Sequence, residues 1–330
     1  MSKAQQVSEP ESQDLATSLS NLDDKNLICQ LDHLSVIKIS GKDASQFLHG
    51  QFTNDVESLT EQEFHLNGYC DPKGRLLALF YLIRFADHYQ MIIASSIQEN
   101  VLKRLKMYVL MADVEFAATR QTCNGLVCDK QSISALFPDI NMSTQQVVCI
   151  GDDFLTPLAD GKRYLYISQS DNANQFELTH CDNSVWRLLD IQYGLPTLVE
   201  KTQGCFVPQM MNLDLVNGLS FSKGCYPGQE VVARMHHLGK LKRRMIRIAI
   251  QCEETPLSGD GIYSIGSTNN ESVGKIVTAL PTGDNQYQAL AVMLIKHIGD
   301  SDLYLDDGID TTIQFLELPY NIPDTLTEQQ

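Results

Sequence analysis

The chain has 330 residues, of which 43% are hydrophobic and 20% are charged, so it is long enough for two or three domains with a sizeable core. It contains no run of about 18 apolar residues, and its amino terminus lacks the apolar segment of a signal peptide, so we expect a cytoplasmic protein without a membrane span. The net charge of −16 argues against a dedicated nucleic-acid binder.

The nine cysteines are scattered along the chain. They form no CxxC pair and no zinc-like spacing, and cysteines in a reducing compartment stay as free thiols. We therefore expect nine free thiols, no disulfide and no resident metal or iron–sulfur cluster. His49, His236 and His237 are candidate metal ligands by residue type only, and we expect the last two to point to opposite faces of a strand.

The first part of the chain has the pattern of a mixed α and β structure. Residues 1–22 are polar and lack periodicity, which predicts a disordered tail. A strand is expected over 34–41, followed by a short helix that ends at Gly50. Residues 63–85 form two β runs around a DPKG turn, which predicts a hairpin.

A helix then follows, opened by a capping box of Ser96 and Glu99, and strand character resumes at 114–118 and 125–129. This order of strands, helix and strands predicts an antiparallel α+β layer of ferredoxin-like type.

The second part repeats short strands and then changes character. Strands are expected at 145–151 and 164–168, and a helix within 183–196 ends at Gly194 and Pro196. Beyond residue 245 the segments are short, β-like and separated by Gly, Asp and Asn, which is typical of a small β-barrel. The sequence therefore predicts two ferredoxin-like α+β modules over 23–244 and a C-terminal β-barrel domain over 245–330.

Positive charge is concentrated in residues 231–250, which we call the basic island because they contain six basic residues and no Asp or Glu. Two interpretations stand: a solvated strand and loop, or a site for an anionic ligand. The basic residues are Arg234, Lys240, Lys242, Arg243, Arg244 and Arg247.

The segment KGCYPGQE at 223–230 resembles the signature of the YgfZ family of folate-binding proteins, which are related to the T protein (aminomethyltransferase) of the glycine cleavage system. Further segments occur in the family's order, and the resemblance covers roughly residues 30–320. They are FLHGQFTNDV at 47–56, CDPKGR at 70–75, WRLLDIQYGLP at 186–196 and FVPQMMNLD at 206–214.

The resemblance implies three modules around a central channel that binds tetrahydrofolate or another reduced folate. It also implies a role in the synthesis or repair of iron–sulfur enzymes, including those that thiomethylate tRNA. The expected partners are these enzymes or their assembly proteins, with tRNA contacted only weakly or indirectly. We expect a monomer.

Within the signature, the resemblance makes Cys225 the functional thiol. Lys223 is placed to favour the thiolate, the form that attacks electrophiles or binds metal. Trp186, the one tryptophan, is either a core anchor or, as the resemblance implies, a flat ring beside the folate. The predicted folate-binding residues are Trp186, Gln192, Lys223, Tyr226, Gln229 and Arg234.

The chain departs from its relatives at the pterin contacts. Some relatives have a second folate-associated tryptophan where this chain offers His33 or Leu34. T-protein relatives carry Glu where this chain has Gln192, and an amide accepts one hydrogen bond and donates another. Asp190 either compensates or is an ordinary exposed helical aspartate.

A further departure concerns the reaction. The T protein uses an aspartate a few residues after its hairpin glycines, whereas GRLLALF at 74–80 offers apolar residues only, which disfavours aminomethyl transfer. Asp71, Lys73 and Arg75 are either turn residues or contacts for the folate tail.

Three functions follow. The leading one is a folate-dependent accessory protein for iron–sulfur enzymes and thereby for tRNA modification. The alternative is a folate-dependent one-carbon transferase or demethylase, for which the sequence shows no convincing base. The third is a folate-sensing module that contacts a protein or tRNA through the basic island.

Overall fold

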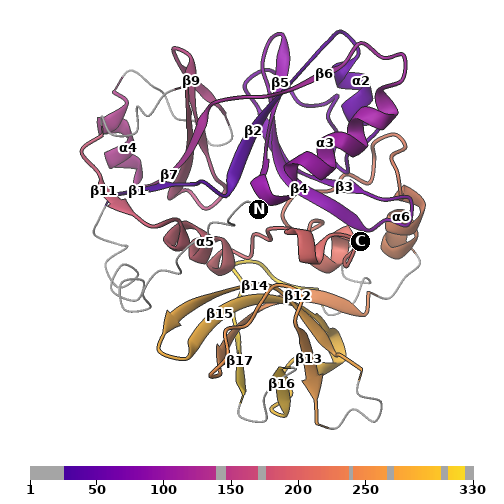
Figure 1. Ribbon diagram of the computed structural model, residues 1–330, viewed down its shortest axis with the longest axis vertical. Coiled ribbons are helices and arrows are strands. Elements are labelled where there is room, and N and C mark those ends of the chain that lie inside the picture. Colours follow the sequence, from indigo (N-terminus) through magenta and orange to yellow (C-terminus); the bar gives the residue numbers. More distant parts are fainter. Residues whose placement is uncertain are drawn as a thin grey trace, which may run out of the picture.

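The computed structural model describes residues 26–138, 146–169, 176–237, 241–265, 271–305 and 311–323 (Figure 1). The tail predicted over residues 1–22 lies outside this part of the chain. The described residues form three sheets with helices packed around them, which confirms the α+β class. Within these ranges, no helix is long and apolar enough to cross a membrane.

The first sheet is antiparallel with the order β3-β4-β5-β2-β6. The predicted hairpin is confirmed as β3 and β4, with Gly74 at a φ of +75° in the turn. Helices α2 (Ala44–His49) and α3 (Ser95–Val109) belong to this unit. The strands are β2 (Leu34–Ser40), β3 (Phe64–Cys70), β4 (Leu76–Arg84), β5 (His88–Ala94) and β6 (Glu115–Ala118).

Helix α3 begins differently from the expectation. Its N-cap is Ala94, without a side-chain hydrogen bond, so the predicted capping box of Ser96 and Glu99 is wrong. Instead, the hydroxyl of Ser95 lies 2.7 Å from that of Ser35 on β2, and the Ser95 N–H donates to the carbonyl of His33, just before β2, at 2.8 Å. Tertiary contacts rather than a local motif fix the start of this helix.

The second sheet has the order β11-β1-β7-β10-β9-β8, with one parallel pair, β1 and β11. Its helices are α4 (Lys130–Leu136) and α5 (Asn183–Gln192). With five and six strands, neither sheet has the four strands of a β-α-β-β-α-β module, so the ferredoxin-like detail is not confirmed. The strands are β1 (Leu27–Gln30), β7 (Thr122–Val127), β8 (Val148–Ile150), β9 (Asp153–Pro157), β10 (Arg163–Ser168) and β11 (Thr179–Cys181).

The third sheet is antiparallel with the order β16-β13-β14-β15-β12-β17, and it curls into a half-barrel rather than a closed barrel (Figure 1). Its first strand starts at Arg243, while the boundary at residue 244 stays a prediction. The strands are β12 (Arg243–Gln251), β13 (Gly261–Ser264), β14 (Gly274–Gly283), β15 (Gln286–Leu294), β16 (Leu303–Leu305) and β17 (Thr312–Leu316).

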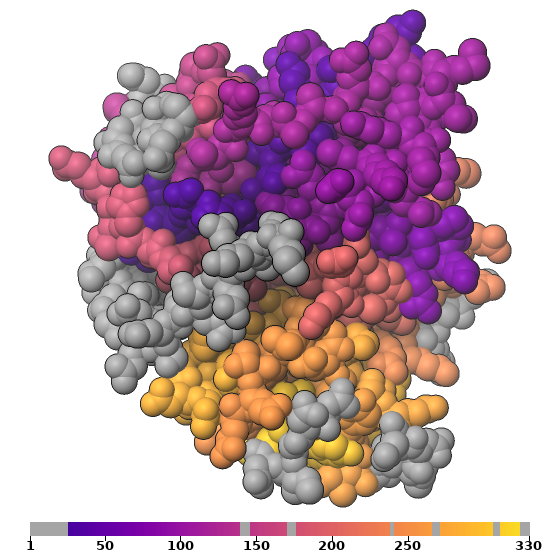
Figure 2. All heavy atoms as spheres, viewed as in Figure 1, coloured from indigo at the N-terminus to yellow at the C-terminus, as the bar shows by residue number. Residues whose placement is uncertain are grey.

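One apolar core joins the three sheets at α5. It contains Trp186 of α5, Leu165 of the second sheet, Leu79 of the first and Leu290 of the third. In Figure 2 the orange and yellow atoms of the third sheet meet the indigo to red atoms of the other two along a broad front. Burial of this shared surface holds α5 between the sheets.

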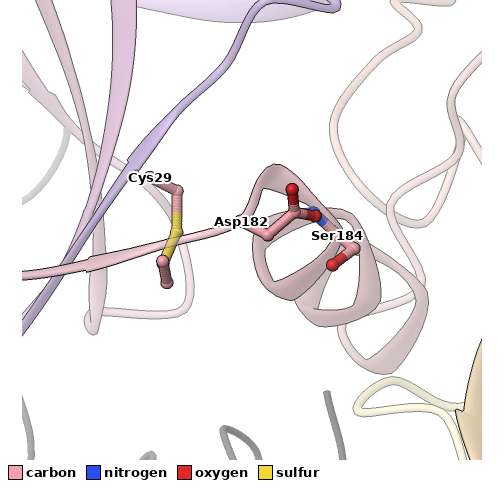
Figure 3. The surroundings of a disulfide bond; sticks show 4 residues. Cys29, Asp182 and Ser184 are labelled. Carbon is pink, nitrogen blue, oxygen red and sulfur yellow. A yellow bond between two sulfur atoms is a disulfide. The ribbon is translucent and has the colours of Figure 1, made fainter. Parts of the chain in front are cut away.

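The expectation of nine free thiols is wrong, because Cys29 and Cys181 form a disulfide (Figure 3). The two residues are opposite each other in the parallel pair of β1 and β11, with Cα atoms 5.0 Å apart. Their separation of 152 residues hides this pairing from the sequence. The next residue, Asp182, caps α5 by accepting a 2.8 Å hydrogen bond from the N–H of Ser184.

The expected structure of the basic island also differs from the observed one. Its beginning belongs to helix α6 (Gln229–His237) rather than to a strand and loop, so His236 and His237 are helical neighbours. Arg244 is buried and contacts both carboxylate oxygens of Asp214 at 2.6 and 2.9 Å. Lys240 lies outside the described residues.

Two more arginines of the island have partners within the protein. Arg243 donates to the carbonyls of Ser272 and Val273, and Arg247 Nη2 lies 2.7 Å from Gln288 Oε1. Three of the six basic residues of the basic island, Arg243, Arg244 and Arg247, therefore bind other parts of the protein from β12. Arg234 and Lys242 are exposed.

Candidate functional site

Residues 223–228, which we call the cysteine loop, pack directly on the β3–β4 hairpin turn. Gly228 has a φ of +83°, and a Cβ there would lie 2.5 Å from Asp71 O and from Gly74 Cα. The turn itself is fixed by Asp71, whose Oδ1 accepts the N–H groups of Lys73 and Arg75 at 2.8 and 2.9 Å. The CDPKGR and KGCYPGQE segments therefore meet backbone to backbone, which requires glycine.

The other family segments enclose the same place. Leu76, just after the turn, donates its N–H to Phe206 O at 2.8 Å. Gln209 Nε2 donates to Val232 O of α6 at 2.7 Å. The segment 206–214 thus contacts the residue that follows 70–75 and helix α6, while Lys223 contacts 47–56 through the carbonyls of His49 and Phe52.

Lys223 anchors the cysteine loop to the end of α2. Its side chain is buried, and Nζ donates to the carbonyls of His49 and Phe52, the latter at 2.6 Å. Nζ also lies 5.0 Å from the ring centroid of Tyr226. Burial lowers the pKa of Lys223 to about 8. The ammonium is engaged by carbonyls, and its predicted effect on the thiol stays a prediction.

Cys225 is exposed on this loop. A Cβ on the preceding Gly224 would lie 3.3 Å from Nε2 of His49. Nδ1 of His49 in turn lies 3.2 Å from Oδ1 of Asp55. Sequence reasoning considered His49 only as a metal ligand and missed Asp55, although both belong to the FLHGQFTNDV segment.

The remaining predicted residues of the signature differ in exposure. Tyr226 is buried, which raises the pKa of its phenol. Gln229 is half-buried at the start of α6, and Arg234 is exposed on the same helix. Their folate-binding roles stay predictions.

A second site, which we call the central pocket, lies between the first two sheets and α5. Its cavity volume, counted as the space open to the centre of a water-sized sphere, is about 60 Å³. Its wall is mostly apolar and includes Tyr81 of β4, and its polar groups include His33 and Asp190. Burial, followed by the charge of Arg187, lowers the pKa of His33 to about 4, so the imidazole is neutral near pH 7.

Arg163 supports the wall of the central pocket from within the core. Its side chain is fully buried, and it pairs with Asp160 and Asp190 at 2.6 Å each. Burial, the largest influence, disfavours its charge, but the two carboxylates hold the pKa of Arg163 above its usual value. The guanidinium also lies 4.7 Å from the ring centroid of Trp186. Asp190 is therefore fixed by its ion pair with Arg163 and is not an exposed helical aspartate.

Trp186 is both a core residue and part of the pocket wall. It lines the central pocket but is only 2% exposed. Arg163 covers the ring, and a Cβ on Gly125 would lie 2.2 Å from Cε3, so the surface available to a stacked ligand is small. Gln192 is half-buried and does not line the pocket, whereas Asp190, His33 and Leu34 do.

The two sites are separate places on one hairpin. Leu76 lies at the turn beside the cysteine loop, and Tyr81 lines the central pocket five residues further along β4. At about 3.3 Å per residue, this is roughly 16 Å along the strand. Among the described residues that line the pocket, none comes from 223–234. Of the predicted residues, Trp186 lines the central pocket, those of 223–234 lie in the cysteine loop or on α6, and Gln192 belongs to neither site.

Comparison with known proteins gives the family. A scan against protein-family models found no match. The chain is 33% identical over 317 residues to the tRNA-modifying protein YgfZ of Colwellia psychrerythraea, covering 92% of this chain and 96% of that protein. The chain belongs to the YgfZ family. A second YgfZ relative, the tRNA-modifying protein of Aliivibrio fischeri, is 30% identical over 304 residues, covering 90% and 93% of the two chains.

YgfZ membership confirms the resemblance that the family segments indicated. The fold is shared more widely. The crystal structure of the glycine cleavage system aminomethyltransferase T from Bartonella henselae matches 92% of this chain and 89% of its own, with a TM-score of 0.73 and 12% identity. At that identity the likeness shows a common fold.

Proposed function

We propose that the chain is a folate-binding accessory protein that supports iron–sulfur enzymes and thereby tRNA modification, with Cys225 as its functional thiol. The observation that carries the proposal is similarity over 90% or more of the chain to proteins named tRNA-modifying protein YgfZ. The exposed position of Cys225 on a loop held by glycine and carbonyl contacts supports it, because a reacting thiol must be accessible and well positioned.

The central pocket is the candidate site for the pterin end of a reduced folate. Its mostly apolar walls fit a flat ring, and the carboxylate of Asp190 can accept N–H donors. Asp190 therefore replaces Gln192 as the candidate for pterin recognition. Arg163 would hold this carboxylate in place, and a bound folate would supply one-carbon chemistry.

The first experiment tests the thiol. Cys225→Ala, expressed in a strain that lacks the protein, should fail to restore thiomethylated tRNA, measured by mass spectrometry of digested tRNA. Cys149→Ala, which removes an exposed thiol on β8, is the matched control and should restore it fully. Full rescue by Cys225→Ala at normal protein level would overturn the role of the thiol.

The second experiment tests the folate. Trp186 is the sole tryptophan and lines the pocket, so its fluorescence should change when tetrahydrofolate is added. Asp190→Asn should weaken binding by about tenfold or more through loss of a charge-assisted hydrogen bond, whereas Gln192→Ala should leave binding unchanged. A flat titration confirmed by calorimetry would remove folate from the proposal.

A folate-dependent one-carbon transferase or demethylase is the second candidate. The observation that favours it is a half-buried carboxylate, Asp190, in the wall of the central pocket. Against it, the strand after the hairpin turn carries apolar side chains from Leu76 to Phe80. Formation of methylenetetrahydrofolate from small amines, measured with purified protein, would favour this candidate.

A further inference from the structure

The disulfide of Cys29 and Cys181 lies at the start of α5. Cys181 is the last residue of β11, and the next residue, Asp182, caps α5 by accepting a hydrogen bond from the N–H of Ser184. Figure 3 shows the disulfide beside the first turn of this helix. The covalent bond therefore fixes the point at which the chain leaves the second sheet and enters α5.

Cys29 connects the same bond to the wall of the central pocket. It is opposite Gly125 on β7, so the two residues share one face of the sheet. Gly125 packs on Trp186, because an added Cβ would lie 2.2 Å from Cε3 of the ring. Trp186 and Asp190, one turn further along α5, both line the pocket. The disulfide thus reaches the pocket wall by packing at Cys29 and along the chain at Cys181.

The strand that carries Cys181 is held by few other contacts. Strand β11 has three residues, lies at the edge of the second sheet and pairs in parallel with β1. Parallel pairing is less stable per residue than antiparallel pairing, and short edge segments open readily. Thr179 and His180 are exposed. Loss of the covalent bond should therefore loosen β11 and the start of α5.

The two sulfur atoms differ in accessibility. Cys29 is 0% exposed, whereas Cys181 is half-buried. A thiolate that approaches from solvent therefore meets Cys181 first. Cys29 is the leaving group, and its surroundings disfavour a thiolate, since burial raises the pKa of Cys123 on the neighbouring strand β7 to about 12. Release of Cys29 thus requires proton uptake, which opening of β11 permits.

We propose that Cys29 and Cys181 are a site of reversible thiol–disulfide exchange with a dithiol, and that this exchange controls the central pocket through α5. One thiolate of the dithiol attacks Sγ of Cys181, the S–S bond breaks, and Cys29 leaves and takes up a proton. The second thiolate attacks the mixed disulfide and releases Cys181, which is then protonated. The dithiol becomes a disulfide, and its two electrons and two protons reduce the two cysteines.

The exchange itself is independent of the proposed function, whereas its effect on ligand binding rests on the proposed folate site. Two experiments keep these parts separate. One follows the two cysteines and Trp186 without any ligand. The other measures tetrahydrofolate binding in the oxidised and the reduced protein.

The first experiment equilibrates the full chain, without oxygen, in mixtures of reduced and oxidised dithiothreitol. Acid quenching, denaturation, alkylation and peptide mass spectrometry then give the fraction of each cysteine that is reduced. Cys29 and Cys181 should become labelled together at one midpoint, while circular dichroism shows a folded chain. Cys123, a free thiol, should be labelled in every mixture. Labelling of Cys29 and Cys181 in the oxidised protein, or only after unfolding, would overturn the exchange site.

Trp186 reports the effect on α5 in the same mixtures, because it is the sole tryptophan of the chain. Its emission should change at the midpoint found for the two cysteines. The double variant Cys29→Ala with Cys181→Ala should resemble the reduced protein and should not respond to dithiothreitol. Cys123→Ala is the matched control, since it removes a buried thiol of the same core but keeps the disulfide, and should respond as the wild type does.

The second experiment measures tetrahydrofolate binding by calorimetry without oxygen. Reduction should weaken binding by about fivefold or more, as expected for two coupled sites. Unchanged Trp186 emission together with unchanged affinity would overturn the control of the pocket. A change in Trp186 emission on reduction, in a protein that binds no tetrahydrofolate in either state, would support the exchange site and its effect on α5 while contradicting the proposed function.

Discussion

The cysteine loop and the central pocket are built on the same hairpin, yet different forces hold them. The loop depends on backbone contacts, with Gly228 against Gly74 and Lys223 bound to two carbonyls. The central pocket depends on side chains, above all the buried guanidinium of Arg163 with its carboxylates. The loop therefore presents an exposed thiol on a fixed backbone, whereas the pocket presents one oriented carboxylate in an apolar wall.

The largest effect should come from the ion pairs behind the central pocket. Arg163→Met leaves Asp160 and Asp190 without their buried cation, which should lower the free energy of unfolding by about 3 to 5 kcal/mol. Urea unfolding followed by circular dichroism measures this. Adding Asp190→Asn should recover part of the loss. A loss below about 1 kcal/mol would show that the pair behaves like a surface salt bridge.

A smaller effect should come from the backbone contact under the cysteine loop. Gly228→Ala places a Cβ 2.5 Å from the backbone of Asp71 and Gly74, so we expect a loss of about 3 kcal/mol and a displaced loop. Gly151→Ala is the control, because its φ of +64° is also positive but nothing lies within 4 Å. It should cost about 1 kcal/mol. If both variants lost the same free energy of unfolding, backbone strain at positive φ, rather than the close contact at Gly228, would explain both losses.

The smallest effect concerns acid stability at the central pocket. The pKa of His33 falls from 6.5 to about 4 on folding, so the folded state binds fewer protons than the unfolded state in this window. Stability should therefore fall as the pH drops from 6.5 to 4, and His33→Gln should show a smaller fall. His180→Gln, which changes an exposed side chain, should behave like the wild type. Identical pH profiles for His33→Gln and wild type would contradict the burial of a neutral imidazole.

The hairpin and the cysteine loop were predictable because their signals are local. DPKG predicts a turn, and the structure places Gly228 of the cysteine loop against the backbone of Gly74 in that turn. The central pocket was only partly predictable. Trp186 and Asp190 line it and Gln192 does not, and the pairing of Asp190 with Arg163 on a distant strand could not be predicted from the sequence.

The same reason explains the larger errors. Cys29 and Cys181 are brought together by a strand pairing across 152 residues, and Arg243, Arg244 and Arg247 find partners that only the packed third sheet supplies. In both cases the partner residue is far away in the chain. Local sequence patterns therefore predicted free thiols, and for the basic island either a solvated strand and loop or an anion site.

By itself, the sequence determined the α+β class, the β-rich C-terminal unit and the YgfZ resemblance, since turns, periodicity and glycine spacing act over a few residues. Only the tertiary structure decided which side chains share a site. It separated the cysteine loop from the central pocket, placed His49 against Gly224, and paired Asp190 with Arg163. The physical reason is that burial and ion pairing depend on distances between segments that only folding fixes.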